Sequence, residues 1–308
     1  MFDKIETPKQ DDLWSDWLLH RDGGDAAYGT QLRKSLEVMR DQVLDNARLQ
    51  NGQTLLDIGS GDGLIAFGAI ERVGRTLKAI CTDISVPMLE HTKRLAQASG
   101  FAGQCVFQAC SASDLKDIWD QSVDVVTSRA ALAFVEDKPA AFGEFFRVLK
   151  PGGRISFCEP ILQDKSFELM ALQRFLAANP SHPGATRMRL AHRLLSAQYP
   201  ATETEVAANP LTNFSERDLV ALACDAGFVE VQLRLHIDVQ PGLIRSWQVF
   251  LNTSPHPWAP CSAEVLARAF NDEERRQFEE LMRPSIEAGH GVTKDSFAYL
   301  TAMKPAGV

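Results

Sequence analysis

The chain has 308 residues, 45% of them hydrophobic and 23% charged, which provides enough apolar material for a folded core and excludes a disordered chain. Its formal net charge is −8 and it has no long run of lysine and arginine, which argues against nucleic acid as a partner. The longest apolar run, Leu64–Ile70, is far too short to span a membrane.

The amino-terminal segment lacks a basic stretch followed by an apolar one, so no secretory signal is predicted and a cytoplasmic location is expected. The cysteines are scattered without a C-x-x-C pair, which favours free thiols in a reducing compartment and no metal site. They are Cys81, Cys105, Cys110, Cys158, Cys224 and Cys261.

Residues 11–48 have the apolar spacing of helices, interrupted at Gly23 and Gly24. We expect residues 1–50 to form a helical lid over a ligand site, with His20 close to the interruption. Plain packing of an N-terminal helix explains the same pattern equally well.

The segment Leu55–Gly63, LLDIGSGDG, predicts a strand, a tight turn and the start of a helix. Asp57 ends the strand, and the glycines allow backbone conformations that side chains would prevent. Asp62 is expected to cap the following helix. A loop of this kind points backbone N–H groups and a helix N-terminus at a ligand. A dinucleotide fingerprint would need a further glycine where this chain has Leu64.

Strands and helices continue to alternate as far as residue 160, with further strands predicted at Leu77–Asp83, Gln104–Gln108, Ser122–Thr127 and Arg154–Cys158. Asp83 ends its strand at the edge where the glycine loop lies, from which an acid can hydrogen-bond ribose hydroxyls. Capping of the strand end is the simpler alternative for Asp83. Later strands are predicted at Val229–Val239 and Phe297–Met303. The expected fold class is therefore α/β, a doubly wound, mostly parallel seven-stranded sheet.

Two insertions with helical patterns interrupt this sheet. The first covers residues 161–212, and the second, 241–293, contains a proline-rich segment and a further helix. Segments 213–240 and 294–308 are expected to complete the sheet. The chain shows no internal repeats or low-complexity linkers, so a single domain spanning 1–308 is the simplest organisation.

Three features of residues 54–160 resemble the core of the class I S-adenosylmethionine-dependent methyltransferases: the loop DIGSGDG, the acid Asp83, and the passage LKPGGR at Leu149–Arg154. Among subgroups, the chain is similar to the small-molecule methyltransferases related to the ubiquinone and menaquinone C-methylases. The resemblance implies a Rossmann-like methyltransferase fold with helical insertions. It also implies a single methyltransferase domain with residues 51–160 as the cofactor-binding core and S-adenosyl-L-methionine as the cofactor.

The resemblance further implies which residues bind S-adenosyl-L-methionine. The glycine loop and the end of the fourth strand would face its methionine part, and the ends of the second and third strands its ribose and adenine. Ser111 departs from the family, which commonly has an acid there, and a structural ion pair is the alternative role for Arg129. The implied contacts are Asp57, Gly59, Ser60, Gly61, Asp83, Ile84, Ser111, Ala112, Ser128 and Arg129.

Methyl transfer from a sulfonium is an in-line displacement, so the protein chiefly has to position the acceptor. A base is needed only when the acceptor must lose a proton. The candidate catalytic residues are Glu159, at the carboxyl end of the fifth strand, and His20, in the expected lid. A structural hydrogen-bonding role is at least as good an interpretation of Glu159.

Several other side chains have two interpretations each. His236 lies on the polar face of a late strand and is expected to face solvent. Trp247 and Trp258 either line an apolar substrate pocket or close the core of the second insertion. A basic cluster in the first insertion either receives an acidic substrate or forms a solvated helix face: Arg187, Arg189, His192 and Arg193.

The sequence thus predicts methyl transfer to a small-molecule acceptor, with no nucleic-acid partner and no membrane span; a monomer and a homodimer are both compatible with it. One alternative is an arsenite or thiol-type methyltransferase, weakened because residues 161–210 contain no cysteine. Another is a non-catalytic, regulatory S-adenosylmethionine-binding protein, against which the intact glycine loop argues. A nicotinamide dehydrogenase is disfavoured by Leu64.

Overall fold

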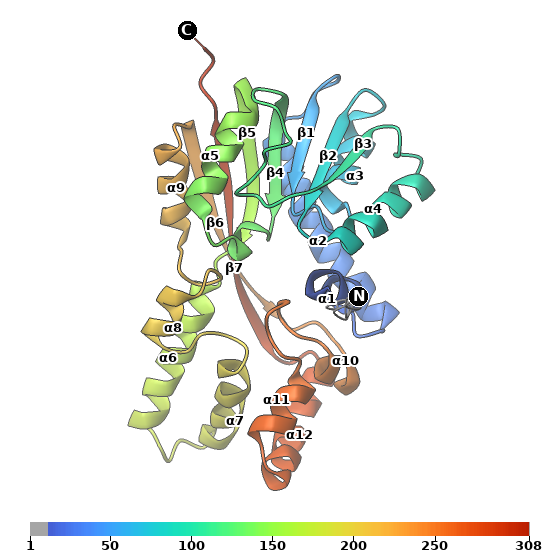
Figure 1. Ribbon diagram of the computed structural model, residues 1–308. Helices are drawn as coiled ribbons and strands as arrows, with labels where there is room; N and C mark the ends of the chain where they lie inside the picture. Colours follow the sequence, from blue (N-terminus) through green and yellow to red (C-terminus); the bar gives the residue numbers. More distant parts are fainter. Residues whose placement is uncertain (1–11, 308) are drawn as a thin grey trace, which may run out of the picture.

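The sheet at the centre of the molecule has seven strands in the order β3-β2-β1-β4-β5-β7-β6. The computed structural model describes residues 12–307. Strands β3, β2, β1, β4 and β5 run parallel to one another, whereas β7 is antiparallel to both of its neighbours (Figure 1). The predicted α/β fold with a mostly parallel, seven-stranded sheet is confirmed. The strands are β1 (Thr54–Ile58), β2 (Lys78–Asp83), β3 (Cys105–Ala109), β4 (Val123–Arg129), β5 (Leu149–Pro160), β6 (Val229–Pro241) and β7 (Val292–Met303).

Helices cover both faces of the sheet and form a second region beyond the carboxyl ends of its parallel strands (Figure 1). Residues 1–11 of the expected lid and residue 308 of the last expected segment lie outside the described residues. No helix within residues 12–307 combines the length and the apolarity that a bilayer crossing requires. The helices are α1 (Leu13–His20), α2 (Ala26–Ala47), α3 (Leu64–Val73), α4 (Val86–Ala98), the 3₁₀ turn η1 (Leu132–Phe134), α5 (Lys138–Val148), α6 (Gln163–Ala178), α7 (Ala185–Ser196), α8 (Glu203–Ala208), α9 (Glu216–Asp225), α10 (Trp247–Asn252), α11 (Ser262–Ala269) and α12 (Asp272–Glu287).

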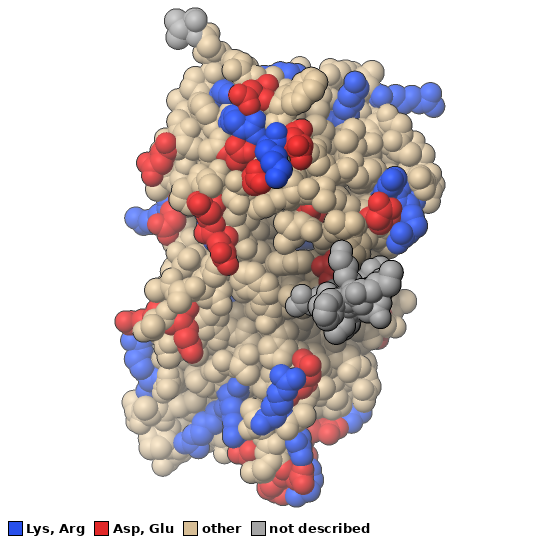
Figure 2. Space-filling view, in the orientation of Figure 1, with Lys and Arg blue, Asp and Glu red and all other residues tan. Residues whose placement is uncertain are grey.

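Charged side chains of both signs lie intermixed on the face of the molecule shown in Figure 2. Lysine and arginine side chains stand next to aspartate and glutamate over the sheet region and over the insertion helices. The middle of this face, between the two regions, is mostly uncharged. This distribution agrees with the acidic composition of the chain and differs from the continuous basic surface that binds a phosphate backbone.

Two apolar clusters hold the helices against the sheet. On one face, Phe142 and Phe145 of α5 pack against Phe157 of β5, with ring centroids 6.0 and 5.3 Å from that of Phe157. On the other face, Val43 of α2 and Ile65 of α3 belong to the same cluster as Leu55 of β1. Full burial of side chains of this size contributes about 1.5–3 kcal/mol each. Because both faces are covered, the central strands carry nearly continuous apolar runs.

The helix after the glycine loop begins differently from the prediction. Gly63, with φ +78°, stands at the cap position of α3, and no side chain caps the helix. Asp62 instead accepts a hydrogen bond from Arg33 of α2 at 3.0 Å and lies 3.5 Å from Arg21. The prediction that Asp62 caps α3 is wrong, because a left-handed glycine takes the cap position and arginines of the N-terminal segment bind the carboxylate.

Strands β6 and β7 are longer than predicted and continue past the end of β5. Strand β5 pairs with β7 only from Phe297 onward, so residues 292–296 of β7 pair with β6 alone, as a two-stranded ribbon. The sequence missed this part of β7 because Lys294 and Asp295 break the apolar pattern. The ribbon carries residues 242–291 at its tip and holds them beyond the carboxyl ends of the parallel strands (Figure 1).

The helices of the two insertions share one apolar cluster. Leu190 of α7, in the first insertion, packs in the same cluster as Phe270 and Phe278 of the second. Trp247 of α10 stacks on Phe250, with ring centroids 5.0 Å apart, and closes this cluster. The two insertions therefore form one helical wall next to the carboxyl ends of the strands.

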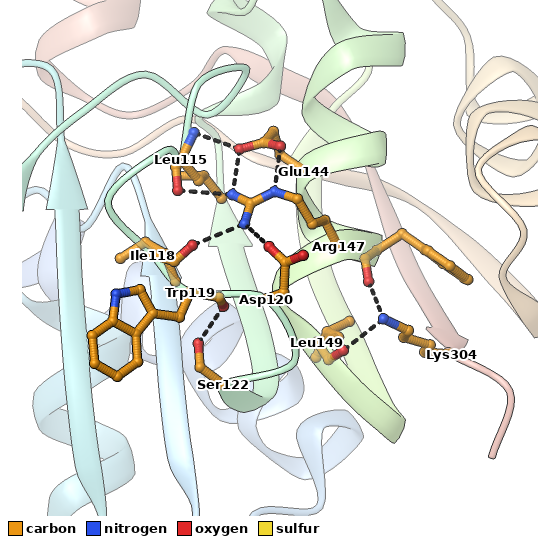
Figure 3. A network of polar contacts seen from close by, with 10 residues as sticks. Leu115, Ile118, Trp119, Asp120, Ser122, Glu144, Arg147, Leu149 and Lys304 are labelled. Atoms are coloured by element: carbon orange, nitrogen blue, oxygen red, sulfur yellow. Dashed lines mark hydrogen bonds and ion pairs between the residues drawn. The ribbon is translucent and has the colours of Figure 1, made fainter. Parts of the chain in front are cut away.

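A polar network near the amino-terminal end of β4 fixes the segment between β3 and β4 (Figure 3). The guanidinium of Arg147, in α5, lies 2.7 Å from Glu144 and 2.5 Å from Asp120, and donates to the carbonyl oxygens of Ile118 and Leu115. Glu144 also accepts the backbone N–H of Leu115 at 2.7 Å. The hydrogen bonds to Glu144 and Asp120 raise the pKa of Arg147. The Arg147 side chain thus holds the connection between β3 and β4 against α5.

Replacement of Arg147 by lysine is expected to lower the free energy of unfolding by about 2 kcal/mol, because an ammonium group cannot reproduce the planar five-donor fork. Urea unfolding measures the effect. Arg217→Lys is the control, since 92% of the Arg217 side chain is exposed. Equal loss of stability in the two variants would contradict the anchoring role of the network.

Candidate active site

The glycine loop between β1 and α3 is held against β2 and the turn after β4. The backbone N–H of Ser60 donates to a carbonyl of β2 at 2.8 Å, and that of Gly61 donates to Asp83 Oδ2 at 3.0 Å. Gly59 has φ +61°, and a Cβ atom there would lie 2.5 Å from Cβ of Ala131. The loop therefore reaches its position only without a side chain at Gly59.

Asp57, near the end of β1, is a buried carboxyl group with one free oxygen. Its Oδ1 accepts the hydroxyl of Thr127 at 2.8 Å. Oδ2 has no partner with hydrogen-bond geometry among the described residues. Burial raises the pKa of Asp57 to about 7, against the lowering effects of Thr127 and of the nearby backbone N–H of Ala66. The hydroxyl of Ser60 is likewise buried without a partner in the described part of the chain. Buried polar atoms are rarely left unpaired, so these two point to a ligand.

Asp83 ends β2 beside the same loop. Its Oδ1 accepts the N–H of Ser85 at 3.0 Å, its Oδ2 accepts that of Gly61, and burial raises its pKa. These contacts are those of the strand-end cap that the sequence left as an alternative. Each carboxylate oxygen has a second lone pair, so Asp83 can cap the strand and accept from a ligand hydroxyl at once.

A cavity of about 1530 Å³ opens at the carboxyl ends of the parallel strands. It exceeds the roughly 300–1,000 Å³ of an ordinary ligand pocket, so it has room for two ligands side by side. The glycine loop and the ends of β1, β2 and β4 form its inner part. Helices α1 and α2, both insertions and the β6–β7 ribbon form its outer walls.

All but one of the residues expected to bind the cofactor line this cavity. Ser111, which departs from the family pattern, shares a hydrogen bond with the hydroxyl of Ser113 at 2.9 Å. The exception is Ser128. The expected residues that line the cavity are Asp57, Gly59, Ser60, Gly61, Asp83, Ile84, Ser111, Ala112 and Arg129.

Ser128 and Glu159 form a buried pair that is not among the described residues lining the cavity. Both are fully buried, and the Ser128 hydroxyl donates to Glu159 Oε1 at 2.7 Å. Glu159 also accepts the backbone N–H groups of Ala131 and Ala133 at 3.4 Å each, and burial raises its pKa. These contacts match the structural role that the sequence left open for Glu159, because they hold the turn that closes over Gly59.

His20, the second candidate base, lies at the surface. Its ring nitrogen hydrogen-bonds the carbonyl of Asp16 at 2.8 Å, and 75% of its side chain is exposed. The described residues that line the cavity include neither His20 nor Glu159. Neither candidate base therefore lies at the cavity surface, and a catalytic role for either one stays a prediction.

The two tryptophans of the second insertion have different roles. Trp247 packs in the apolar cluster of the insertions and is 5% exposed. Trp258 lines the cavity, with its ring centroid 5.1 Å from that of Phe134 and 6.0 Å from that of Trp14. Trp14, Phe134 and Trp258, here called the aromatic wall, give the outer cavity an apolar side.

The histidines and arginines whose roles the sequence left open also fall into two groups, those that line the cavity and those that do not. His236 lines the cavity from β6, with its ring 4.7 Å from that of Tyr299, instead of facing only solvent. Of the basic cluster in the first insertion, Arg187 lines the cavity. The other members bond within the insertions: Arg189, His192 and Arg193.

Two residues that the sequence analysis missed lie side by side in the cavity wall. His256 is 6% exposed, and its Nε2 lies 2.8 Å from the carbonyl oxygen of Gln198. Tyr199 lies against it, with ring centroids 5.2 Å apart. The available sequence signal was the placement of His256 between Pro255 and Pro257, which restrict the backbone.

Comparisons with known proteins agree with this site. A family model described as a methyltransferase domain matches residues 49–198. The chain is 32% identical over 200 residues to nocamycin O-methyltransferase of Saccharothrix syringae, covering 65% of this chain and 67% of that protein. The chain belongs to the class I S-adenosylmethionine-dependent methyltransferases.

Other relatives of this methyltransferase are named for different acceptors. A tRNA 5-carboxymethoxyuridine methyltransferase of Escherichia coli O157:H7 is 28% identical over 58% of this chain and 67% of its own length. A ubiquinone/menaquinone biosynthesis C-methyltransferase of Escherichia coli O1:K1 is 32% identical over 40% of this chain and 50% of its own. The solved structure of geranyl diphosphate methyltransferase with S-adenosylmethionine shares the fold, with a TM-score of 0.50, 18% identity and 94% coverage of both chains.

The inner cavity fits S-adenosyl-L-methionine, the cofactor of the family. The free Oδ2 of Asp57 is suited to an ammonium group, and the hydroxyl of Ser60 is a second buried polar group without a partner among the described residues. Gly59 lines the same part of the cavity, and its lack of a side chain lets Ala131 lie against the loop. When bound, the cofactor supplies a methyl group activated by a sulfonium; the protein supplies the position and the surroundings.

Cofactor binding is expected to weaken below about pH 7, because the buried Asp57 carboxyl, with a pKa of about 7, must lose its proton to hold an ammonium group. Calorimetric titration should show the Kd rising up to about tenfold per pH unit below 7 and levelling above it. Asp57→Asn should bind more weakly and show no such dependence. A pH-dependent Kd retained by Asp57→Asn would assign the titration to another group.

The same raised pKa has a consequence for stability in the absence of cofactor. Asp57 binds a proton more tightly in the folded state than in the unfolded state, so its protonation adds to the free energy of unfolding. This contribution is present in acid and is lost as the pH rises from about 4 through about 7. Urea unfolding of the wild type and of Asp57→Asn isolates the contribution. The difference in unfolding free energy between them should grow with pH in that window.

Gly59→Ala is expected to weaken cofactor binding by about tenfold or more, because the added methyl group would lie 2.5 Å from Ala131 and displace the loop. Gly52→Ala is a matched control, since its φ is +80° and nothing lies within 4 Å of an added Cβ. Titration with S-adenosylmethionine measures both. The same affinity in the two variants would mean that the contact with Ala131 does not matter.

Proposed function

We propose that this methyltransferase acts on a small, partly apolar acceptor molecule by in-line displacement. The observation that carries the proposal is the single cavity that extends from the glycine loop to the aromatic wall of Trp14, Phe134 and Trp258. An acceptor in the outer part would lie beside the cofactor in the inner part. Holding two reactants together in one cavity supplies much of the rate of a displacement.

In this proposal the strand ends hold the cofactor. Asp57 accepts from the amino group through its free Oδ2, and Asp83 accepts from the ribose hydroxyls through its remaining lone pairs. The loop Gly59–Gly61 and Arg129 face the methionine part. The adenine lies against the turn after β3 and the end of β2, at Ile84, Ser111 and Ala112.

Hydrogen bonds join the outer walls to one another, which supports a pre-formed acceptor chamber. Trp17 of α1 donates from Nε1 to the Ser254 carbonyl at 3.2 Å, joining the N-terminal lid to the second insertion. Gln198 donates from Nε2 to the Pro260 carbonyl at 3.0 Å, joining the first insertion to the second. Walls fixed to one another in this way limit the shape of the acceptor that the chamber can hold.

Other functions have less support. A tRNA acceptor, as named for one relative, favours a basic surface, whereas this chain has a formal charge of −8. An arsenite-type reaction needs several thiols, and among the described residues Cys110 is the one cysteine that lines the cavity. Burial raises the pKa of that thiol to about 11, which keeps it protonated. A purely regulatory protein has no need of space for a second ligand beside the cofactor.

Calorimetric titration with S-adenosylmethionine tests the cofactor site. The wild type should bind with micromolar affinity, and Asp83→Ala should bind about tenfold or more weakly through loss of charge-assisted hydrogen bonds. Asp45→Ala is the control, because Asp45 pairs with Arg72 at the surface of α2. No binding by the wild type would overturn the proposal.

Methyl-labelled S-adenosylmethionine then tests the acceptor class. The enzyme is incubated separately with a low-molecular-mass cell extract and with total tRNA. Label transferred to the low-mass fraction, and lost with Asp83→Ala, is the expected result. Label transferred to tRNA would replace the small-molecule acceptor by the tRNA alternative.

A further inference from the structure

We infer that His256, in the loop Ser254–Pro260 of the second insertion, accepts the proton of the methyl acceptor, and that this acceptor is a flat molecule with an acidic hydroxyl group, a phenol or an enol. The inference rests on the proposed function and makes it more specific. It assigns methylation to oxygen and gives the base to an insertion residue instead of to a strand end.

The hydrogen bond to Gln198 fixes the tautomer of His256. A carbonyl oxygen can only accept, so Nε2, which lies 2.8 Å from it, carries the ring hydrogen. In the neutral ring Nδ1 then has a bare lone pair. Nδ1 is buried and has no partner among the described residues, although His256 lines the cavity. A hydrogen-bond donor on a bound acceptor would satisfy it.

His256 and the cofactor loop line the same cavity, and the aromatic wall lies near both in the chain. Ala131 closes over Gly59 of the cofactor loop, and Phe134 follows it in η1. The ring of Phe134 lies 5.1 Å from that of Trp258, two residues beyond His256. The aromatic wall therefore extends from the turn at Ala131 toward the loop that carries His256, and an aromatic or conjugated acceptor packs well against it.

The loop that carries His256 is held in place before any ligand binds. Trp17 donates a hydrogen bond to the carbonyl oxygen of Ser254, at the start of the loop. Gln198 donates one to the carbonyl oxygen of Pro260, at its end. The prolines on both sides of His256 restrict the backbone further. A base positioned in this way loses little entropy on binding the acceptor.

The reaction balances with this one base. The acceptor oxygen forms a bond to the methyl carbon, the bond from that carbon to sulfur breaks, and its electron pair stays on sulfur. The hydroxyl proton passes to Nδ1 of His256. The products are a methyl ether, S-adenosylhomocysteine and an imidazolium that returns its proton to water.

The strength of the base selects an acidic hydroxyl. Burial lowers the pKa of His256 below the value of about 6.5 for a free imidazole. A phenol, with a pKa of about 10, can give its proton to such a base as the new bond forms. An aliphatic hydroxyl resembles water, with a pKa of about 15.7, and is too weak an acid.

Nitrogen NMR of the histidine-labelled protein with S-adenosylhomocysteine bound tests the geometry without turnover, and the spectrum of His256→Asn assigns the signal. We expect a neutral ring with hydrogen on Nε2 and none on Nδ1. Umbelliferone should shift the Nδ1 signal, and its methyl ether should not. Hydrogen on Nδ1, or the same shift with both compounds, would overturn the inference.

Transfer of labelled methyl to umbelliferone, vanillin, dimedone and aniline tests the acceptor class. We expect transfer to hydroxyl or enol probes, with the rate about 100-fold or more lower in His256→Asn and the Kd of S-adenosylmethionine within about twofold of the wild type. His192→Asn is the matched control, because His192 contacts Ser196 within α7.

The outcomes separate this inference from the function on which it rests. A wild type that does not bind S-adenosylmethionine would refute the methyltransferase site itself. Cofactor binding combined with transfer to aniline, transfer to none of the hydroxyl probes, or full activity in His256→Asn would refute the role of His256 and leave the cofactor site intact.

Discussion

The hydrogen bond between Asp57 and Thr127 is the constraint on which the rest of the site depends. It joins the ends of β1 and β4 in the centre of the sheet and occupies one carboxylate oxygen. The glycine loop starts two residues later, so its path over Ala131 follows from this link. Burial raises the pKa of this carboxyl group, a cost that an ammonium group of a ligand would offset. One carboxylate oxygen thus stays unpaired at the inner end of the cavity.

A second buried pair, Ser128 with Glu159, repeats this arrangement between β4 and β5. It does not line the cavity, but its carboxylate holds the backbone of the turn that contains Ala131 and Ala133. Ala131 of that turn lies against Gly59. Phe134, in the following 3₁₀ turn η1, lines the outer cavity. One rigid turn therefore serves both the cofactor end and the acceptor end.

The sequence predicts the parts of this site that depend on residues close together in the chain. It does not predict contacts between segments that are far apart in the sequence. Strand alternation and glycine spacing predict that Gly59 and Asp83 lie at the carboxyl edge of the sheet, and both line the cavity there. A strand-end position does not say which way a side chain points, so the sequence leaves both a base and a structural role open for Glu159. Local capping rules cannot foresee that Arg33 binds Asp62. The pairing of His256 with Gln198 spans 58 residues and lies beyond any sequence pattern.

The β6–β7 ribbon has two faces of opposite character. His236, Asp238 and Gln240 line the cavity, whereas Ile237 and Val239 lie on the other face and are 51% and 62% exposed. Because side chains alternate along a strand, insertion of one residue would exchange the faces and turn apolar groups into the chamber. Insertion of two in each strand would keep the polar lining and move the second insertion outward by about 6.7 Å. Chamber depth can therefore evolve in paired steps without rebuilding the sheet.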